Sequence, residues 1–248
     1  ELSARIIAKQ VRNKPDSVLG LATGRTMEPL YDILADMHKN EGLDFSLCRS
    51  FNLDEYVGIP GDNKYSYRWY MNHWLFSRIN IDIRNTHVPN GVAKDLGAEC
   101  AAYDALIARL GGIDMQLLGL GEIGHIGFNE PLSSLRSRTR EKALTPHTFA
   151  QNSPLFDKPE DMPKRALTMG IGTILESRQC LMVVTGEKKA DILARSVEGP
   201  VTSMVSASAL QLHPSAIVVV DEGAASKLTH TDYYRWIFEN EPEWQEFR

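Results

Sequence analysis

The segment GLGEIGHIGFNE (residues 119–130) places one histidine and two glutamates among glycine and branched apolar residues. The glycines allow sharp turns, so His125 can be presented at the end of the apolar stretch that precedes it. Glu130, five residues later, can reach back to orient the imidazole and stabilise its charged form. Such a pair is suited to moving protons, and we predict an acid/base role for His125 and Glu130. A histidine with a structural role only is the alternative.

A second pair of ionisable residues, Asp54 and Glu55, directly follows a predicted strand at residues 48–53. Adjacent side chains at a strand end point in different directions, so we expect one carboxylate to face a cleft and the other to face away. A carboxylate in a half-dry cleft has a raised pKa and can act as a general base. The alternative is a helix-capping or surface pair.

Two short glycine loops have the features of anion sites. The first, TGRT (residues 23–26), lies between a predicted strand and a helix expected to begin near residue 28 or 29. Backbone N–H groups and the helix dipole favour an anion there, and Arg25 adds a fork-shaped phosphate contact. In the second, TGEKKA (residues 185–190), a bound anion would explain Lys188 or Lys189 at a helix start. A plain turn and a solvated lysine pair are the alternatives.

These residues together predict a sugar-phosphate-like ligand with two anion sites and an acid/base set of Asp54, His125 and Glu130. Proton transfer next to a carbonyl is the reaction class that needs only these parts. The sequence contains no nucleophile elbow, no Walker lysine loop and no clustered metal ligands, so no motif of these kinds competes with this prediction.

The elements that must position these residues alternate along the chain. Runs of consecutive apolar residues predict strands at 18–22, 48–53, 87–88, 114–120, 180–185 and 216–220. Helical spacing of apolar residues at 30–37 and 190–197 separates some of them. This order indicates an α/β fold, a mostly parallel sheet with right-handed crossovers and helices on both faces. Ligands of such sheets bind beyond the carboxyl ends of the strands, where all four candidate sites lie.

We expect a single domain over residues 1–248, because no linker or repeat divides the chain. The chain opens in a helical pattern without an initiating Met, which leaves open a missing upstream strand. The net charge of −5 excludes a strong electrostatic affinity for nucleic acid. No apolar run is long enough to span a membrane and no leader is recognised, so we expect a cytoplasmic protein. The cysteines Cys48, Cys100 and Cys180 are far apart and are expected to be buried and reduced.

The ordered motifs LATGRT, FNLDEYVG, GLGEIGHIGFNEP, SRTR, LTMGIGTIL, VTGEKKA and ALQLHP cover nearly the whole chain, which resembles the glucosamine-6-phosphate deaminases. The related 6-phosphogluconolactonases share a GxGxxGH turn but are not expected to continue as HIGFNEP. The resemblance implies a modified Rossmann-like fold and conversion of an amino-sugar 6-phosphate and water into a ketose 6-phosphate and ammonia, without a cofactor.

The resemblance also implies residue roles. Asp54 corresponds to the general base that moves a proton between C2 and C1 of the sugar. His125 corresponds to the ring-opening acid/base group, and Glu130 to its supporting relay. The phosphate positions of the family fall on five residues here: Thr23, Gly24, Arg25, Thr26 and Lys189. Four residues match an allosteric site for N-acetylglucosamine 6-phosphate that part of the family has: Ser133, Ser134, Arg140 and Lys142, whereas Ala143 replaces a hydroxyl residue.

Two departures from the family pattern leave alternatives open. Ile123 stands where Asp or Asn usually precedes the Gly-His pair, and Glu122 is the candidate substitute in the relay. Pro154 stands where an arginine commonly grips the phosphate, and Arg25 is the candidate replacement. The alternatives to a glucosamine-6-phosphate deaminase are an enzyme for galactosamine 6-phosphate or another sugar phosphate, and a catalytically weak sugar-phosphate sensor. The sequence does not decide whether the chain forms a homo-oligomer.

Overall fold

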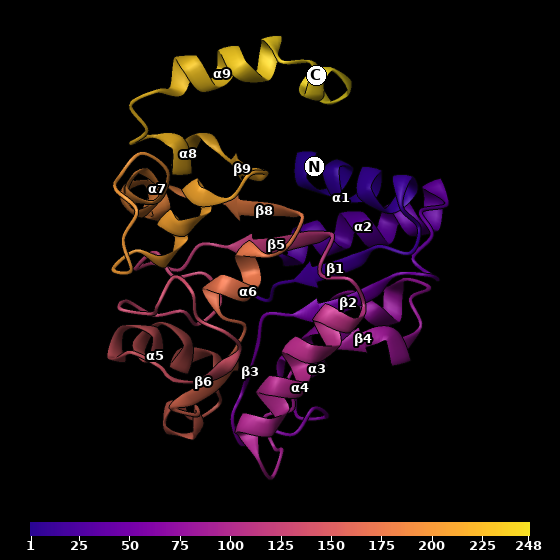
Figure 1. Cartoon of the computed structure of the whole chain (residues 1–248), viewed down its shortest axis with the longest axis vertical. Coiled ribbons are helices and arrows are strands. Elements are labelled where there is room, and N and C mark those ends of the chain that lie inside the picture. The colour runs from indigo at the N-terminus through magenta and orange to yellow at the C-terminus, as the bar shows by residue number, and fades with distance from the viewer.

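The computed structural model describes all 248 residues. Its centre is a six-stranded parallel sheet in the order β4-β2-β1-β5-β8-β9, stacked in that sequence through the molecule (Figure 1). The strands are β1 (Val18–Leu21), β2 (Arg49–Asn52), β4 (Thr86–His87), β5 (Met115–Gly119), β8 (Gln179–Val184) and β9 (Ala216–Val220). All six predicted strands are confirmed, with ends that differ by at most one residue.

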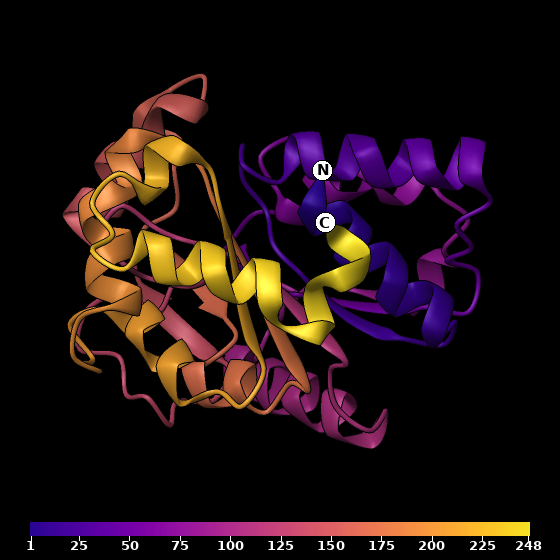
Figure 2. The same cartoon turned by 90° about the horizontal axis from the view of Figure 1, so that it is seen from above.

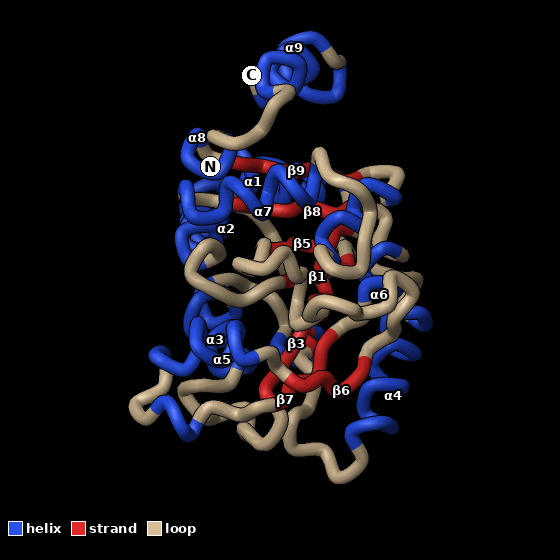
Figure 3. Tube along the Cα trace, turned by 90° about the vertical axis from the view of Figure 1, so that its left-hand side faces the viewer, coloured by secondary structure: helices blue, strands red, loops and turns tan.

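Helices cover both faces of this sheet, as predicted. In Figure 3, α1 and α2 lie on one side of the strands, and α4 and α6 on the other. The helices are α1 (Leu2–Asn13), α2 (Glu28–Glu41), α3 (Tyr67–Trp74), α4 (Leu96–Arg109), α5 (Pro146–Asn152), α6 (Ile171–Leu175), α7 (Ala190–Val197), α8 (Glu222–Ala225) and α9 (Thr231–Asn240). Short 3₁₀ turns connect several of them. The predicted helices at 30–37 and 190–197 are therefore confirmed as α2 and α7.

The local sequence explains where α2 begins and ends. Pro29 lies in its first turn, where a missing N–H costs nothing. Gly42 ends the helix with a φ of 69°, a left-handed conformation that favours glycine. The start of α2 is thereby held directly after the TGRT turn.

A second, three-stranded antiparallel sheet was not predicted. It has the order β3-β7-β6, formed by β3 (Asp54–Tyr56), β7 (Arg165–Thr168) and β6 (Arg140–Ala143). These strands are short and carry several charged residues, so no apolar run marks them. β3 follows β2 after the single residue Leu53, and the chain thereby passes from the parallel sheet into the antiparallel one.

The core of the parallel sheet is well packed around Phe51, which is fully buried. Its ring stacks on His87 with centroids 4.7 Å apart and meets Tyr103 of α4 edge-on at 5.4 Å. The three cysteines are buried and unpaired, as expected.

The last segment of the chain crosses back over the molecule (Figure 2). Glu198 holds its start by accepting hydrogen bonds from the backbone of Thr229 and from the Tyr234 hydroxyl. At its end, Arg5 of α1 donates to the carbonyl oxygens of Glu246 and Phe247. No helix in the structure has the length and apolar character needed to cross a bilayer.

Candidate active site

The predicted site residues gather at one edge of the parallel sheet. Asp54 follows β2, the TGRT turn follows β1, His125 follows β5 and Lys189 follows β8. These four strands are consecutive neighbours and run in the same direction, so their carboxyl ends form a continuous edge. The sequence-based expectation that the four segments meet is supported by this topology.

Asp54 is a buried carboxylate without hydrogen-bond support. Its side chain is 6% exposed and accepts no hydrogen bond from the protein. Burial, assisted by the neighbouring charge of Glu55, raises the pKa of Asp54 to about 8. A carboxylate with such a pKa binds and releases a proton near neutral pH, which is the property that a general base requires.

Glu55 is equally buried but has the opposite environment. Its carboxylate accepts hydrogen bonds from the Ser66 hydroxyl (2.7 Å) and from the backbone N–H groups of Tyr56, Tyr67 and Arg68 (2.9, 3.0 and 3.1 Å). Burial raises the pKa of Glu55, and these hydrogen bonds oppose the rise. The helix-capping alternative weighed for this pair therefore describes Glu55, whereas Asp54 is left free for chemistry.

The turn that carries His125 lies against Asp54. Gly127 has a φ of 56°, and a side-chain carbon at this position would lie 3.4 Å from Oδ2 of Asp54 and 2.9 Å from Oγ1 of Thr168. At Gly121 such a carbon would collide with the His125 ring, only 2.2 Å from Nε2. Glycine is therefore needed at both positions, to seat the imidazole and to bring its turn next to the carboxylate.

His125 and Glu130 lie against each other in the interior of the protein. Nδ1 of His125 lies 3.4 Å from Oε2 of Glu130, and their residues are 9% and 2% exposed. Neither atom has a closer partner, so the contact is an ion-pair distance rather than a well-formed hydrogen bond. Burial acts to raise the pKa of Glu130, but His125, Thr148 and the Thr145 backbone outweigh it and hold the pKa below its usual value. The ionised Glu130 is thus suited to stabilise a protonated His125.

The two segments predicted to bind an anion follow β1 and β8, the strands on either side of β5, whose end carries His125. Gly24, in the turn between β1 and α2, has a φ of 121° and is exposed with Arg25. Lys189 is partly buried at the start of α7, and burial lowers its pKa against the opposing charge of Glu122. A phosphate beside Lys189 would restore the preference for the charged ammonium.

Glu122, the candidate substitute for the residue that Ile123 replaces in the His125 relay, has a partner of its own. Oε2 of Glu122 lies 3.3 Å from Nε2 of His147 in α5. Ile123 is partly buried, and Pro154 lies exposed in a 3₁₀ turn after α5. Glu122 therefore contacts a histidine of the neighbouring segment, and its role in the His125 relay stays a prediction.

The four residues that match an allosteric site lie in the segment after Glu130 and in β6. Ser133 is buried with an unpartnered hydroxyl, and Ser134 is exposed. Arg140 and Lys142 lie on the same face of β6, and both are partly buried. Nη1 of Arg140 donates to Oδ1 of Asn129, the residue before Glu130 (2.8 Å). No effector is present, so regulation stays a prediction.

Sequence reasoning missed the residues that hold the site together. Nδ2 of Asn129 donates to the carbonyl oxygens of Ile126 and Met169 and thereby ties the His125 turn to the end of β7. The Tyr70 hydroxyl of α3 donates to the carbonyl oxygen of Gly24 (2.9 Å). The HIGFNEP motif contains Asn129 and could have signalled it, but no local pattern links Tyr70 to a residue 46 positions away.

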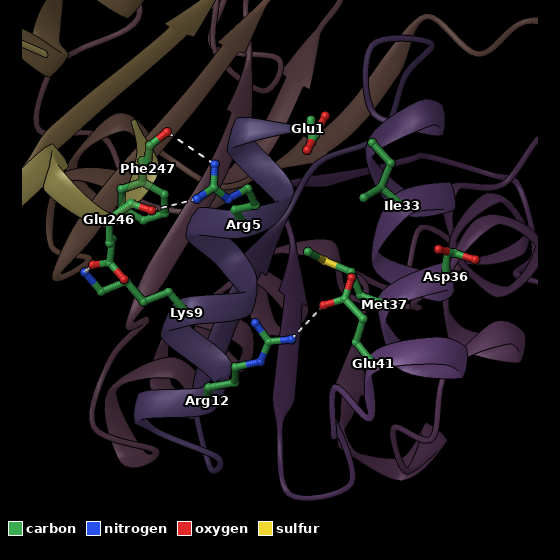
Figure 4. A pocket seen from close by; sticks show the side chains of 10 residues that line it. All are labelled: Glu1, Arg5, Lys9, Arg12, Ile33, Asp36, Met37, Glu41, Glu246 and Phe247. Atoms are coloured by element: carbon green, nitrogen blue, oxygen red, sulfur yellow. Dashed lines mark hydrogen bonds and ion pairs between the residues drawn. The ribbon is translucent and has the colours of Figure 1, made fainter. Parts of the chain in front are cut away.

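A surface hollow of about 550 Å³ lies elsewhere, between α1, α2 and the end of the chain (Figure 4). None of the predicted site residues lines it. Its basic side chains already have partners: Arg12 pairs with Glu41, Lys9 with Glu246, and Arg5 with backbone oxygens. The structure contains no group of three or more His, Cys, Asp or Glu side chains arranged to hold a metal ion.

Comparisons with known proteins agree with this architecture. A family model described as glucosamine-6-phosphate isomerases/6-phosphogluconolactonase matches residues 1–224. A glucosamine-6-phosphate deaminase of Shewanella woodyi is 50% identical over 237 residues, 96% of this chain and 90% of the relative. Another, of Rhodopirellula baltica, is 52% identical over 229 residues, 91% of each chain.

Solved structures give the same result. One described as a monomeric glucosamine-6-phosphate deaminase has a TM-score of 0.89 and 44% identity over 91% of this chain and 94% of its own. A 6-phosphogluconolactonase from Trypanosoma cruzi, 20% identical, has a TM-score of 0.70 over 91% and 92% of the two chains and shares the fold. The chain belongs to the family of glucosamine-6-phosphate isomerases and 6-phosphogluconolactonases.

Proposed function

We propose that this protein converts glucosamine 6-phosphate and water into fructose 6-phosphate and ammonia. One observation carries the proposal: the buried Asp54 carboxylate accepts no hydrogen bond, and the turn with His125 and Glu130 packs against it. The names of the relatives at about 50% identity support the same substrate.

The phosphate is held first, by the backbone N–H groups of the TGRT turn at the start of α2 and by Lys189. His125 then exchanges a proton with the ring and anomeric oxygens, which opens the sugar to its aldehyde form, while Glu130 stabilises the imidazolium. Thr23, Arg25 and Thr26 add side-chain donors to the phosphate site. These contacts fix the position of C1 and C2 relative to Asp54.

Asp54 then removes the proton from C2 and delivers it to C1. The C1 oxygen gains a proton and becomes an alcohol, while the ammonium nitrogen on C2 loses a proton and becomes an imine. Addition of water to this imine releases ammonia and leaves the ketose. Asp54 must be ionised for the first step, and the ammonium group of the substrate favours that form by its positive charge. The phosphorylated substrate is an intracellular metabolite, and we place the reaction in the cytoplasm on this ground.

An ammonia-release assay with glucosamine 6-phosphate and galactosamine 6-phosphate tests the proposal. We expect turnover of the first sugar, and a loss of about 1,000-fold or more in Asp54→Asn, since a positioned general base commonly contributes 10²–10⁴-fold. Turnover of only the galacto epimer would reassign the substrate. Binding of either sugar without any ammonia release would point to a sensor instead.

A further inference from the structure

We propose that Glu55 is a positioning residue for the reaction: its carboxylate fastens the strand of Asp54 to helix α3, and α3 holds the phosphate-binding turn through Tyr70. This inference rests on the proposed sugar-phosphate reaction. It assigns a role to a residue that neither touches the substrate nor transfers a proton.

The first link is the carboxylate itself. Oε1 of Glu55 accepts from the N–H groups of Tyr56 and Tyr67, and Oε2 accepts from the Ser66 hydroxyl and the N–H of Arg68. All four partners donate, so both oxygens act as acceptors and the ionised form satisfies the site. Because two of the donors are the first N–H groups of α3, Glu55 caps that helix from the adjacent strand.

The second link runs along α3 to the phosphate turn. Tyr70, one turn beyond Tyr67, donates its hydroxyl to the carbonyl oxygen of Gly24. Gly24 has a φ of 121°, a backbone conformation that favours glycine. On its other side α3 is held by Arg68, whose guanidinium donates to Oγ1 and the carbonyl oxygen of Thr86 in β4. A shift of α3 would therefore move the turn that binds the phosphate.

The third link is electrostatic. Asp54 interacts electrostatically with four titratable groups: Glu55 and Tyr56 of its own strand, Tyr67 of α3 and Tyr103 of α4. Burial raises the pKa of each tyrosine, so the tyrosines are neutral at pH 7. Glu55 is thus the one charged member of this group and disfavours ionisation of Asp54 until a cationic substrate arrives.

Glu55→Gln tests the electrostatic and the structural links together. The amide keeps the volume of the side chain. It replaces one carboxylate oxygen, an acceptor, by an NH2 group, a donor, and that group then faces two of the four donors that surround Glu55. We expect the Asp54 carboxyl, followed by NMR titration, to release its proton at a pH about 1 unit lower, and KM for the sugar phosphate to rise about 10-fold. Ser66→Ala is the matched variant without a change of charge. It removes the hydroxyl that donates to Glu55 and accepts from the N–H groups of Arg68 and Trp69, and it should leave the pH at which Asp54 titrates unchanged.

Tyr70→Phe tests the link to the turn. It removes one hydroxyl, and we expect KM to rise about 3- to 10-fold with kcat little changed. Ser66→Ala combined with Tyr70→Phe should raise KM by less than the product of the single effects, since both act through α3 on the same turn. Tyr233→Phe, on the exposed face of α9, is the control and should match the wild-type protein.

An unchanged Asp54 titration together with an unchanged KM in folded Glu55→Gln overturns the proposal. If that variant does not fold, independent, multiplicative effects of Ser66→Ala and Tyr70→Phe overturn it. Two measurements need no turnover: the NMR titration of Asp54, and the protection of the protein against thermal unfolding by inorganic phosphate. A wild-type protein that releases no ammonia therefore refutes the proposed function while leaving these two measurements to decide the role of Glu55.

Discussion

Replacing Asp54 by asparagine should remove activity and, at alkaline pH, stabilise the fold. The folded-state pKa of Asp54, about 8, lies above the ordinary value of 3.8. Between these two values the folded protein binds more protons at this site than the unfolded chain does. The free energy of unfolding of the wild-type protein must therefore decrease as pH rises from about 4 to about 8, and then level off. Asparagine has no charge and imposes no such decrease.

The size of the effect follows from the same pair of pKa values. Each pH unit between them corresponds to about 1.4 kcal/mol, which sets an upper bound of about 6 kcal/mol. Water entry and relaxation around a buried charge reduce such values considerably, so we expect on the order of 2 kcal/mol in favour of the variant at pH 9. For a chain of this length that corresponds to a rise in Tm of about 4–8 °C. Near pH 5 the two proteins should be almost equally stable.

Urea unfolding of both proteins at pH 5, 7 and 9 measures this difference. Asp62→Asn provides a control, because Asp62 is an exposed carboxylate and its removal should change none of the three values by more than about 0.5 kcal/mol. Parallel stability curves for wild type and Asp54→Asn from pH 5 to 9 would refute the reasoning. They would mean that the carboxylate is solvated in the folded protein and that its pKa is ordinary.

Three further predictions concern the remaining parts of the site. Lys189→Met should raise KM for the sugar phosphate about 10- to 100-fold with a smaller change in kcat, because the ammonium contributes a charged contact to the phosphate; equal KM values would remove Lys189 from the site. Gly127→Ala should lower kcat about 10-fold or more, since the added methyl group points at Asp54 and Thr168 and the backbone φ is positive; steady-state kinetics on the folded variant check this. Glu130→Gln should lower kcat/KM about 100-fold while keeping the fold, because the imidazolium of His125 loses its counter-charge; an unchanged value would show that His125 needs no such support.

The parallel sheet and the edge that carries the site were predictable because their signals are local. Consecutive apolar residues mark β1, β5 and β8, and the residues after buried parallel strands converge by geometry alone. The antiparallel sheet was not predictable, because strands such as REKA in β6 alternate between half-buried and exposed charged residues. The contacts of Tyr70 with Gly24 and of His147 with Glu122 join residues 46 and 25 positions apart. Neither spacing belongs to a helix or a hairpin, so no periodicity could reveal them.

The different surroundings of Asp54 and Glu55 depend on the antiparallel sheet β3-β7-β6, which was not predicted. Both carboxylates are buried, and alternation along β3 sends them to opposite sides. β3 keeps this orientation because it pairs with β7, where Asp54 lies opposite Thr168. Thr168 also accepts a hydrogen bond from the N–H of Phe128, three residues after His125. The short sheet is therefore the element that brings Asp54, the proposed general base, next to the turn that carries His125. Without it the parallel sheet would supply the residues but not their contact.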